Sequence, residues 1–288
     1  MSVSSALSAA TRLGPVHLAV TDLERSSAFY GEAIGLGVQG RENGVAGLGA
    51  GGEDLVVLHE EPAASRAGNG RAGLYHFALL HPSRLELARA AQRLAVTSTP
   101  IQGASDHKFS EAIYLPDPDG NGIELYADRP RDQWPDPLEA LPPGGPMPLD
   151  LQGLLELARD DGPAGRADPG LVVGHIHLHV GGLEDALGFY RDVIGFEPMM
   201  LTPSAAFVSA GGYHHHLGLN TWRGVGVAAA PVDVVGLRRW TVVLPDDGEV
   251  ARVRGRVEDV GLEHENRNGG FVVRDPWGIP LLVAAEAP

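Results

Sequence analysis

Two copies of one pattern occur in the sequence, and this repeat constrains the fold more than any other feature. The segment VHLAVTDLERSSAFYGEAIGLG, which begins at Val16, aligns without a gap with IHLHVGGLEDALGFYRDVIGFE, which begins at Ile176. An Asp-Pro-x-Gly turn follows near the end of each copy, at 117–120 and at 275–278. Self-similarity over such a length indicates two tandem copies of one domain.

Each copy subdivides into two units that begin with a strand and a helix. In the first unit a strand at 16–20 leads through a capping-box pattern into a helix that ends near Gly35. The second unit starts with the strand GLYHFALL at 73–80, continues with a helix over about 83–94 and ends in short strands. The pattern therefore predicts an α+β fold of four βαβββ units.

The repeat also predicts the domain boundaries. We expect one domain over 10–130 and a second over 173–288. The Pro-rich segment between them, 131–172, is expected to be a connector with one short helix.

Composition excludes several classes of function. The formal net charge is −15, which argues against binding to nucleic acid or to an anionic membrane, since both need a basic surface. The chain has no Cys, so thiolate metal ligands and a Cys nucleophile are excluded. No stretch approaches the ~20 apolar residues of a membrane span, and we expect a soluble, cytoplasmic protein.

Three short strands each carry one side chain that could bind a metal ion. On a strand, alternate residues share a face, so His17 lies opposite the apolar face of 16–20, and His76 shares a face with Ala78. Glu124 follows the turn at 117–122 on a third strand, where it is either a solvated charge or a ligand. Two imidazoles and one carboxylate suit a divalent iron or manganese ion with open positions.

The four units resemble the vicinal-oxygen-chelate superfamily, which includes glyoxalases, bleomycin-resistance proteins and extradiol dioxygenases. The resemblance covers nearly the whole chain and implies cupped mixed sheets, each formed by two units around one metal site. It places the ligands on the first strands of two units and on a last strand, which favours His17, His76 and Glu124. The segments DPDGNGIELYAD and GHIHLHV are most like those of bacterial two-domain proteins similar to catechol 2,3-dioxygenase.

The second half cannot build the same triad. Arg239 or Trp240 stands where His76 stands in the first half, and Leu282 stands where Glu124 stands. This half has its own histidines, so His177 and His216 form either a second metal site or a hydrogen-bonded polar layer.

The resemblance also assigns two catalytic candidates. Tyr114 precedes the Asp-Pro turn at the spacing found in catechol 2,3-dioxygenases, where such a Tyr orients a substrate oxygen. His107 lies in the loop where those enzymes place an acid–base His, and a simple exposed loop His is the alternative. His is suited to proton transfer near neutral pH.

The resemblance implies a ring-cleaving dioxygenase of aromatic catabolism that uses Fe(II), or else Mn(II), with a catechol- or hydroquinone-type substrate and O₂. A homo-oligomer is compatible with this expectation. A metal-dependent lyase or isomerase of the glyoxalase kind is the alternative, but it usually needs a fourth ligand, for which only His59 and Glu60 are available. Binding without turnover is a third alternative, and a complete triad argues against it.

Overall fold

A computed structural model describes the fold. Its described residues are 6–66, 68, 70–135, 146–161, 165–267 and 269–285. The middle of the predicted connector, 136–145, therefore lies outside the described residues.

Four βαβββ units are present, as the sequence predicts. The first contains β2 (Val16–Val20), α1 (Leu23–Phe29) with the π-helical turn η1 (Tyr30–Ile34), β3 (Gly37–Glu42), β4 (Val45–Gly49) and β5 (Val56–Glu60). The second contains β6 (Gly73–Leu80), α2 (Arg84–Val96), β7 (Gly103–Asp106), β8 (Ser110–Pro116) and β9 (Gly122–Asp128). The third contains β11 (Val172–His179), α4 (Leu183–Leu187) with η3 (Gly188–Ile194), β12 (Glu197–Leu201), β13 (Ala205–Ser209) and β14 (Leu217–Asn220). The fourth contains β15 (Gly236–Leu244), α5 (Asp247–Asp259), β16 (His264–Arg267), β17 (Gly270–Arg274) and β18 (Pro280–Ala285).

Short elements lie outside the units. These are β1 (Arg12–Leu13), the 3₁₀ turn η2 (Arg131–Gln133), β10 (Met147–Pro148) and α3 (Leu151–Leu157), the last being the short helix expected in the connector.

The strands form two mixed sheets, and each sheet combines one unit from each half of the chain. The first sheet has the order β16-β17-β18-β15-β2-β5-β4-β3 and joins the fourth unit to the first. The second sheet has the order β10-β7-β8-β9-β6-β11-β14-β13-β12 and joins the second unit to the third. Within each unit the first and last strands are parallel neighbours, whereas the two units of a sheet meet through antiparallel first strands.

This pairing corrects the simple division of the chain at the connector. The boundaries 10–130 and 173–288 follow the repeat in the sequence, but neither range contains a complete sheet. The physical reason is that β6 and β11 are both eight residues long and pair along their length, so each half completes the sheets of the other.

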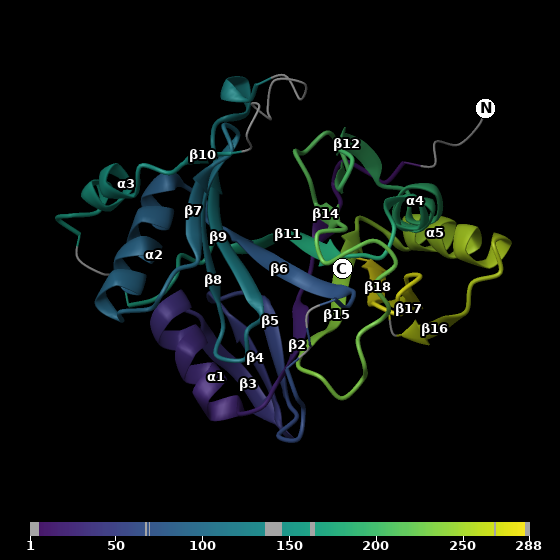
Figure 1. The fold of residues 1–288 in the computed structure, drawn as a ribbon, viewed down its shortest axis with the longest axis horizontal. Helices are drawn as coiled ribbons and strands as arrows, with labels where there is room; N and C mark the ends of the chain where they lie inside the picture. The colour runs from purple at the N-terminus through teal and green to yellow at the C-terminus, as the bar shows by residue number, and fades with distance from the viewer. Residues whose placement is uncertain are drawn as a thin grey trace.

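One continuous apolar core lies between the helix-covered faces of the two sheets. It includes Leu18 and Trp240 from the first sheet, Phe77 and Ile176 from the second, and Val253 from α5. Helices α1 and α2 lie at one end of the molecule and α4 and α5 at the other, with the strands between them (Figure 1). The opposite face of each sheet is the concave face of the cupped sheet.

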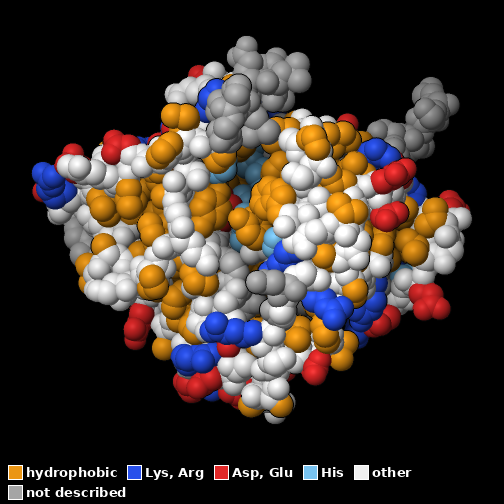
Figure 2. Space-filling view, viewed as in Figure 1, with side chains coloured by type: hydrophobic (Ala, Val, Ile, Leu, Met, Phe, Trp, Pro, Cys, Tyr) orange, Lys and Arg blue, Asp and Glu red, His pale blue; other side chains and the backbone are white. Residues whose placement is uncertain are grey.

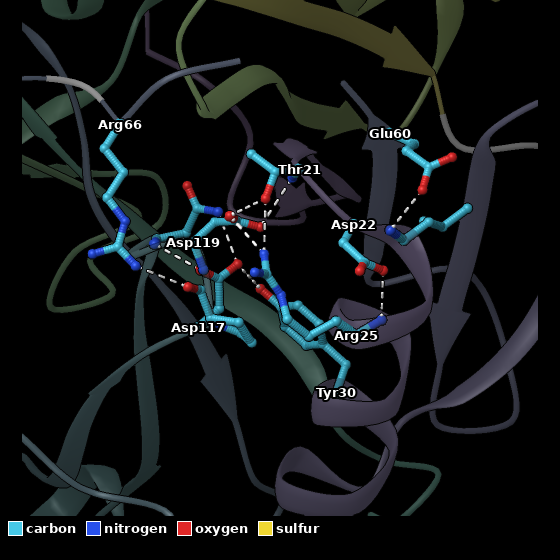
Figure 3. A network of polar contacts seen from close by, with 11 residues as sticks. Thr21, Asp22, Arg25, Tyr30, Glu60, Arg66, Asp117 and Asp119 are labelled. Atoms are coloured by element: carbon cyan, nitrogen blue, oxygen red, sulfur yellow. Dashed lines mark hydrogen bonds and ion pairs between the residues drawn. The ribbon is translucent and has the colours of Figure 1, made fainter. Parts of the chain in front are cut away.

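The turn that precedes Glu124 is held by a polar network from the first unit (Figure 3). The Asp119 carboxylate accepts hydrogen bonds from the Thr21 N–H and hydroxyl at 3.1 and 2.7 Å and forms an ion pair with Arg25. The buried Asp117 accepts a hydrogen bond from the Tyr30 hydroxyl at 3.2 Å. Because Thr21 follows a strand of the first sheet and the turn belongs to the second, this network ties the two sheets together beside the start of β9.

Among the described residues, no helix combines the length and the apolar character that crossing a bilayer requires.

One buried histidine outside the concave faces predicts an acid-sensitive fold. His81 is 2 % exposed, and among the described residues neither of its ring nitrogens has a hydrogen-bond partner. Burial, with a smaller effect of Arg93, lowers the pKa of His81 to about 3. In the unfolded chain His81 binds a proton near pH 6.5, whereas in the folded protein it stays neutral at that pH. The contribution of neutral His81 to the free energy of unfolding is therefore complete above pH 6.5 and is lost as the pH falls.

When the pH falls from 7 to 5, we expect the free energy of unfolding of the unmodified protein to decrease by about 2 kcal/mol more than that of the His81→Leu variant. Urea unfolding at the two pH values measures this difference. An unchanged pH dependence in the variant would show that His81 does not resist protonation in the fold.

Candidate metal centre

Strand register in the second sheet brings three potential ligands to one concave face. Ala78 in β6 pairs with His175 of β11 on one side and with Glu124 of β9 on the other. Residues directly opposite each other in a sheet share a face, as do alternate residues of one strand. His175, Glu124 and His76 therefore point to the same side.

Two irregularities in the β6–β11 ladder shape this face. Gly174 is an extra residue between the pairs of Val173 and His175, and a side chain at Gly174 would collide with the Tyr126 hydroxyl. The second irregularity lies at Tyr75, and it allows the adjacent Tyr75 and His76 both to line the same cavity. Bulges commonly redirect side chains beside functional sites in this way.

The three side chains converge closely and are buried. One ligand atom from each of His76, Glu124 and His175 lies within 4.8 Å of the other two, and among the described residues this is the one group of three or more such side chains. Oε2 of Glu124 lies 2.9 Å from Nε2 of His76 and 3.1 Å from Nε2 of His175. The His76 contact lacks the alignment of a hydrogen bond, so both buried ring nitrogens of His76 are without a hydrogen-bond partner among the residues that the structure describes.

His17 does not join this group, which corrects the ligand set His17, His76 and Glu124 expected from the sequence. His17 lies on β2 in the first sheet. Its Nδ1 contacts Nε2 of His59 at 3.0 Å, and its Nε2 accepts a hydrogen bond from Arg239 at 2.8 Å. The third member of the group is His175, because the second unit pairs with the third and not with the first.

A signal for His175 was present in the sequence. His76 directly precedes the core residue Phe77, and His175 likewise directly precedes the core residue Ile176. His17 instead follows the equivalent core residue, Val16, and therefore stands at the position of His177. The two ligand histidines, His76 and His175, both stand before a core residue, whereas the repeat aligns His17 with His177.

The charges in the group suit a divalent cation. Burial acts to raise the pKa of Glu124, but the neighbouring His175 and His76 outweigh burial and hold this pKa well below its usual value. Burial lowers the pKa of His175 by more than the Glu124 charge raises it. An ionised carboxylate and a neutral imidazole are the forms that bind metal ions.

The residues present therefore fit a bound divalent metal ion. Two imidazole nitrogens and one carboxylate oxygen form the donor set used by iron(II) and manganese(II) sites that keep room for other ligands. The unsatisfied His76 nitrogens give an independent reason, since buried polar atoms rarely lack a partner unless a ligand supplies one.

The two catalytic candidates lie together beside this group. Tyr114 pairs with Glu124 across β8 and β9, and its hydroxyl lies 2.7 Å from Nε2 of His107. Burial and then the Glu124 charge raise the pKa of Tyr114 well above its usual value. Burial lowers the pKa of His107 against the opposite effect of Glu124. At neutral pH the pair therefore consists of a protonated phenol and a neutral imidazole.

A second chain of polar contacts, which the sequence did not reveal, reaches the group from the third unit. Asp128 lies 2.9 Å from Nε2 of His214, and Nδ1 of His214 lies 2.8 Å from Nδ1 of His215. The His215 ring packs on that of His175, with centroids 4.1 Å apart. If His214 donates to the carboxylate, its Nδ1 must accept from His215, which leaves Nε2 of His215 as an unprotonated base.

His177 and His216, the candidate ligands of a second metal site, lie in different environments. His177 pairs with His76 and lines the cavity around the group, and its buried Nε2 has no hydrogen-bond partner within the described ranges. Nδ1 of His216 instead contacts the Ser209 hydroxyl at 2.8 Å and accepts from the Ala210 N–H. His216 therefore behaves as a hydrogen-bonded polar residue, which was the alternative left open by the sequence.

A cavity of about 660 Å³ opens in front of the three ligand side chains. In Figure 2 it is a hollow in which histidine side chains are visible between hydrophobic patches. Its walls are rich in aromatic side chains, namely Tyr75, Phe109, Trp134, Phe207 and Trp222. A pocket of this size and lining accommodates a small aromatic molecule.

The chain is similar to known proteins over most of its length. Residues 12–125 match the family model of the glyoxalase/bleomycin resistance protein/dioxygenase superfamily. A protein of Bacillus subtilis (strain 168) named catechol-2,3-dioxygenase is 43% identical over 270 residues, which cover 92% of this chain and 94% of that protein.

Solved structures support the fold. A protein of Bacillus subtilis subsp. subtilis str. 168, provisionally named a dioxygenase, has a TM-score of 0.70 at 13% identity and covers 99% of this chain and 87% of its own. Glyoxalase I from Zea mays has a TM-score of 0.60 at 18% identity, with 96% of this chain and 92% of that chain covered. With the repeated units, the cupped mixed sheets and the long match to a relative, the chain belongs to the glyoxalase/bleomycin resistance protein/dioxygenase superfamily.

Proposed function

We propose that the protein is an extradiol dioxygenase that cleaves a catechol- or hydroquinone-type aromatic ring with O₂. The observation that carries the proposal is the convergence of His76, Glu124 and His175 at the base of an aromatic-lined cavity, beside the Tyr114–His107 pair. The name and the 43% identity of the Bacillus subtilis relative support the same reaction.

His76, Glu124 and His175 would hold the metal ion, for which iron(II) is the first candidate and manganese(II) the second. A bound ion of this kind supplies Lewis acidity toward the substrate hydroxyls and the electron exchange that O₂ chemistry needs.

The Tyr114–His107 pair would handle the substrate proton. When the Tyr114 oxygen takes up the proton of a substrate hydroxyl, the Tyr114 proton passes to Nε2 of His107, which is neutral and 2.7 Å away. The imidazolium formed in this way can return the proton by the same path once a negative charge develops on the opening ring. The buried position of the pair keeps bulk water from competing for the proton.

Gly218 argues against a lyase of the glyoxalase kind. In the second unit, Ala78 pairs with the ligand Glu124 on the last strand. The equivalent pair in the third unit is His177 with Gly218, so the position from which a fourth ligand would come carries no side chain. A side chain there would also collide with the His177 ring, at 2.8 Å from its nearest atom.

Oxygen uptake tests the proposed reaction. We expect protein loaded with Fe(II) under anaerobic conditions to consume one O₂ per catechol and to form a product with the mass of catechol plus O₂. Turnover of a carbonyl substrate without O₂ uptake would instead favour the lyase. The Glu124→Ala variant is the control for metal-dependent uptake.

A further inference from the structure

The first sheet has a second concave face whose residues occupy the same positions as the ligand group. Thr241 in β15 pairs with Leu282 of β18 in the way that Ala78 pairs with Glu124, so Leu282 stands at the carboxylate position. His17 pairs with Arg239 in the way that His177 pairs with His76, so Arg239 stands at the position of His76.

Pro15 completes this correspondence, because it precedes His17 by two residues as His175 precedes His177. The three ligand positions are therefore occupied by Pro15, Arg239 and Leu282, none of which binds a metal cation. In this sheet the positively charged Arg239 guanidinium stands where the second sheet has a metal-binding histidine.

Arg239 is a half-buried charge. Among the residues that the structure describes, no carboxylate oxygen lies within 4.0 Å of its guanidinium, whereas the adjacent Arg238 is paired with Glu61 at 2.5 Å. Nε of Arg239 is buried and has no hydrogen-bond partner in the described parts of the chain. Burial and then the nearby Arg267 lower the pKa of Arg239. A guanidinium remains charged, so an anion that enters this place gains both an ion pair and an unused donor.

The neighbouring imidazoles extend the donor surface. Arg239 donates to Nε2 of His17, so the His17 proton lies on Nδ1 and is donated to Nε2 of His59. Burial and the Arg239 charge lower the pKa of His17 to about 3 and also lower the pKa of His59. His59 is therefore neutral with its proton on Nδ1, which has no partner among the described residues. The cluster therefore offers hydrogen-bond donors at both ends.

Apolar side chains surround this cluster. Val57 pairs with His17 and shares its face, and Leu282 and Val243 of β18 and β15 lie on the same concave side. Asp54, a carboxylate on this face, lies over Gly47 in β4, which β5 and β2 separate from Arg239. The Glu61 carboxylate, whose charge also acts on His59, is already paired with Arg238. An anion with an apolar body suits such a surface better than a fully hydrated inorganic anion.

We propose that this second concave face binds a small organic carboxylate, with Arg239 as its anchor and the His17–His59 pair as a second donor. The site is independent of the metal centre, since it lies on the other sheet and uses none of its residues.

Imidazole NMR of protein labelled with ¹⁵N-histidine tests the proposal, with benzoate as the probe. We expect saturable shifts of the His17 and His59 signals and at least a tenfold weaker interaction in Arg239→Gln. Arg191→Gln is the matched control, because Arg191 is an exposed arginine paired with Asp192 and its loss changes the net charge equally. This control should bind benzoate as the unmodified protein does.

Three outcomes would overturn the proposal. They are equal binding by Arg239→Gln, shifts confined to the histidines of the metal centre, and equally strong shifts with inorganic phosphate, which has no apolar body. Metal content shows whether Arg239→Gln is folded, and Arg239→Lys, which retains the charge, should recover part of the binding. Because metal retention and oxygen uptake are measured separately, failure here leaves the proposed dioxygenase activity untouched.

Discussion

The His175→Ala variant is expected to lose its metal ion, whereas His17→Ala retains it. His175 contributes one of three buried ligand atoms that lie within 4.8 Å of one another, so its removal leaves two protein ligands. Changes outside the ligand shell of metal sites already cost about 10–100-fold in affinity, and loss of a ligand should cost more than that. Elemental analysis of protein purified without chelator, followed by anaerobic titration with Fe(II), measures the difference.

His17→Ala is a matched control for this experiment. Both residues are strand histidines in the first strand of a unit, and both lie on a concave face. His17, however, contacts His59 and Arg239 in the first sheet. His76→Ala and Glu124→Ala should behave like His175→Ala. Equal metal loss in His17→Ala, or full metal content in His175→Ala, would contradict the ligand group described here.

Much of the local structure was predictable because each element carries its own signals. Asp22 and Ser83 cap α1 and α2 with their side chains, and Gly35 ends the first helical segment at a φ of 89°. Such signals depend on neighbouring residues alone, so they are visible without knowledge of the fold. The repeat then extended the prediction from one unit to all four.

Pairing between units could not be read in the same way. The first strands of all four units have similar core-facing patterns, and any two of them could meet side by side. The sequence repeat suggests that each half closes on itself, but β6 pairs with β11 and β15 pairs with β2. Hydrophobic alternation indicates which face of a strand is buried, and it does not indicate which strand is its neighbour.

The candidate site shows the consequence of this limit. His76 and Glu124 come from the same unit, whose parallel β6–β9 pair is local to it, and both are in the group that the structure brings together. The third ligand comes from the unit that pairs with the second one, so it could be predicted only if the pairing of units was known. The sequence therefore indicated His17 instead of His175. The same dependence hid the contact of Asp128 with His214, which joins the second unit to the third.

The Tyr114→Phe variant is expected to lower kcat by about 10²–10⁴-fold while metal content stays unchanged. The substitution removes the hydroxyl that lies 2.7 Å from Nε2 of His107, and it keeps the ring that packs on the cavity wall. Because the aromatic surface remains, KM should change little. Oxygen uptake at saturating catechol and metal content of the same preparation give the two readouts.

Tyr75→Phe provides the comparison, since Tyr75 also lines the cavity but its hydroxyl has no hydrogen-bond partner among the described residues. We expect its kcat to remain within a few-fold of the unmodified protein. If Tyr114 and His107 move one proton as a unit, the double variant Tyr114→Phe/His107→Gln should be about as slow as the slower single variant. If the decreases in kcat of the two single variants multiply in the double variant, Tyr114 and His107 act separately. A large decrease in kcat for Tyr75→Phe would show that hydroxyl groups on the cavity wall matter in general. The 2.7 Å contact joins the two side chains before any substrate binds, so we expect the non-additive result.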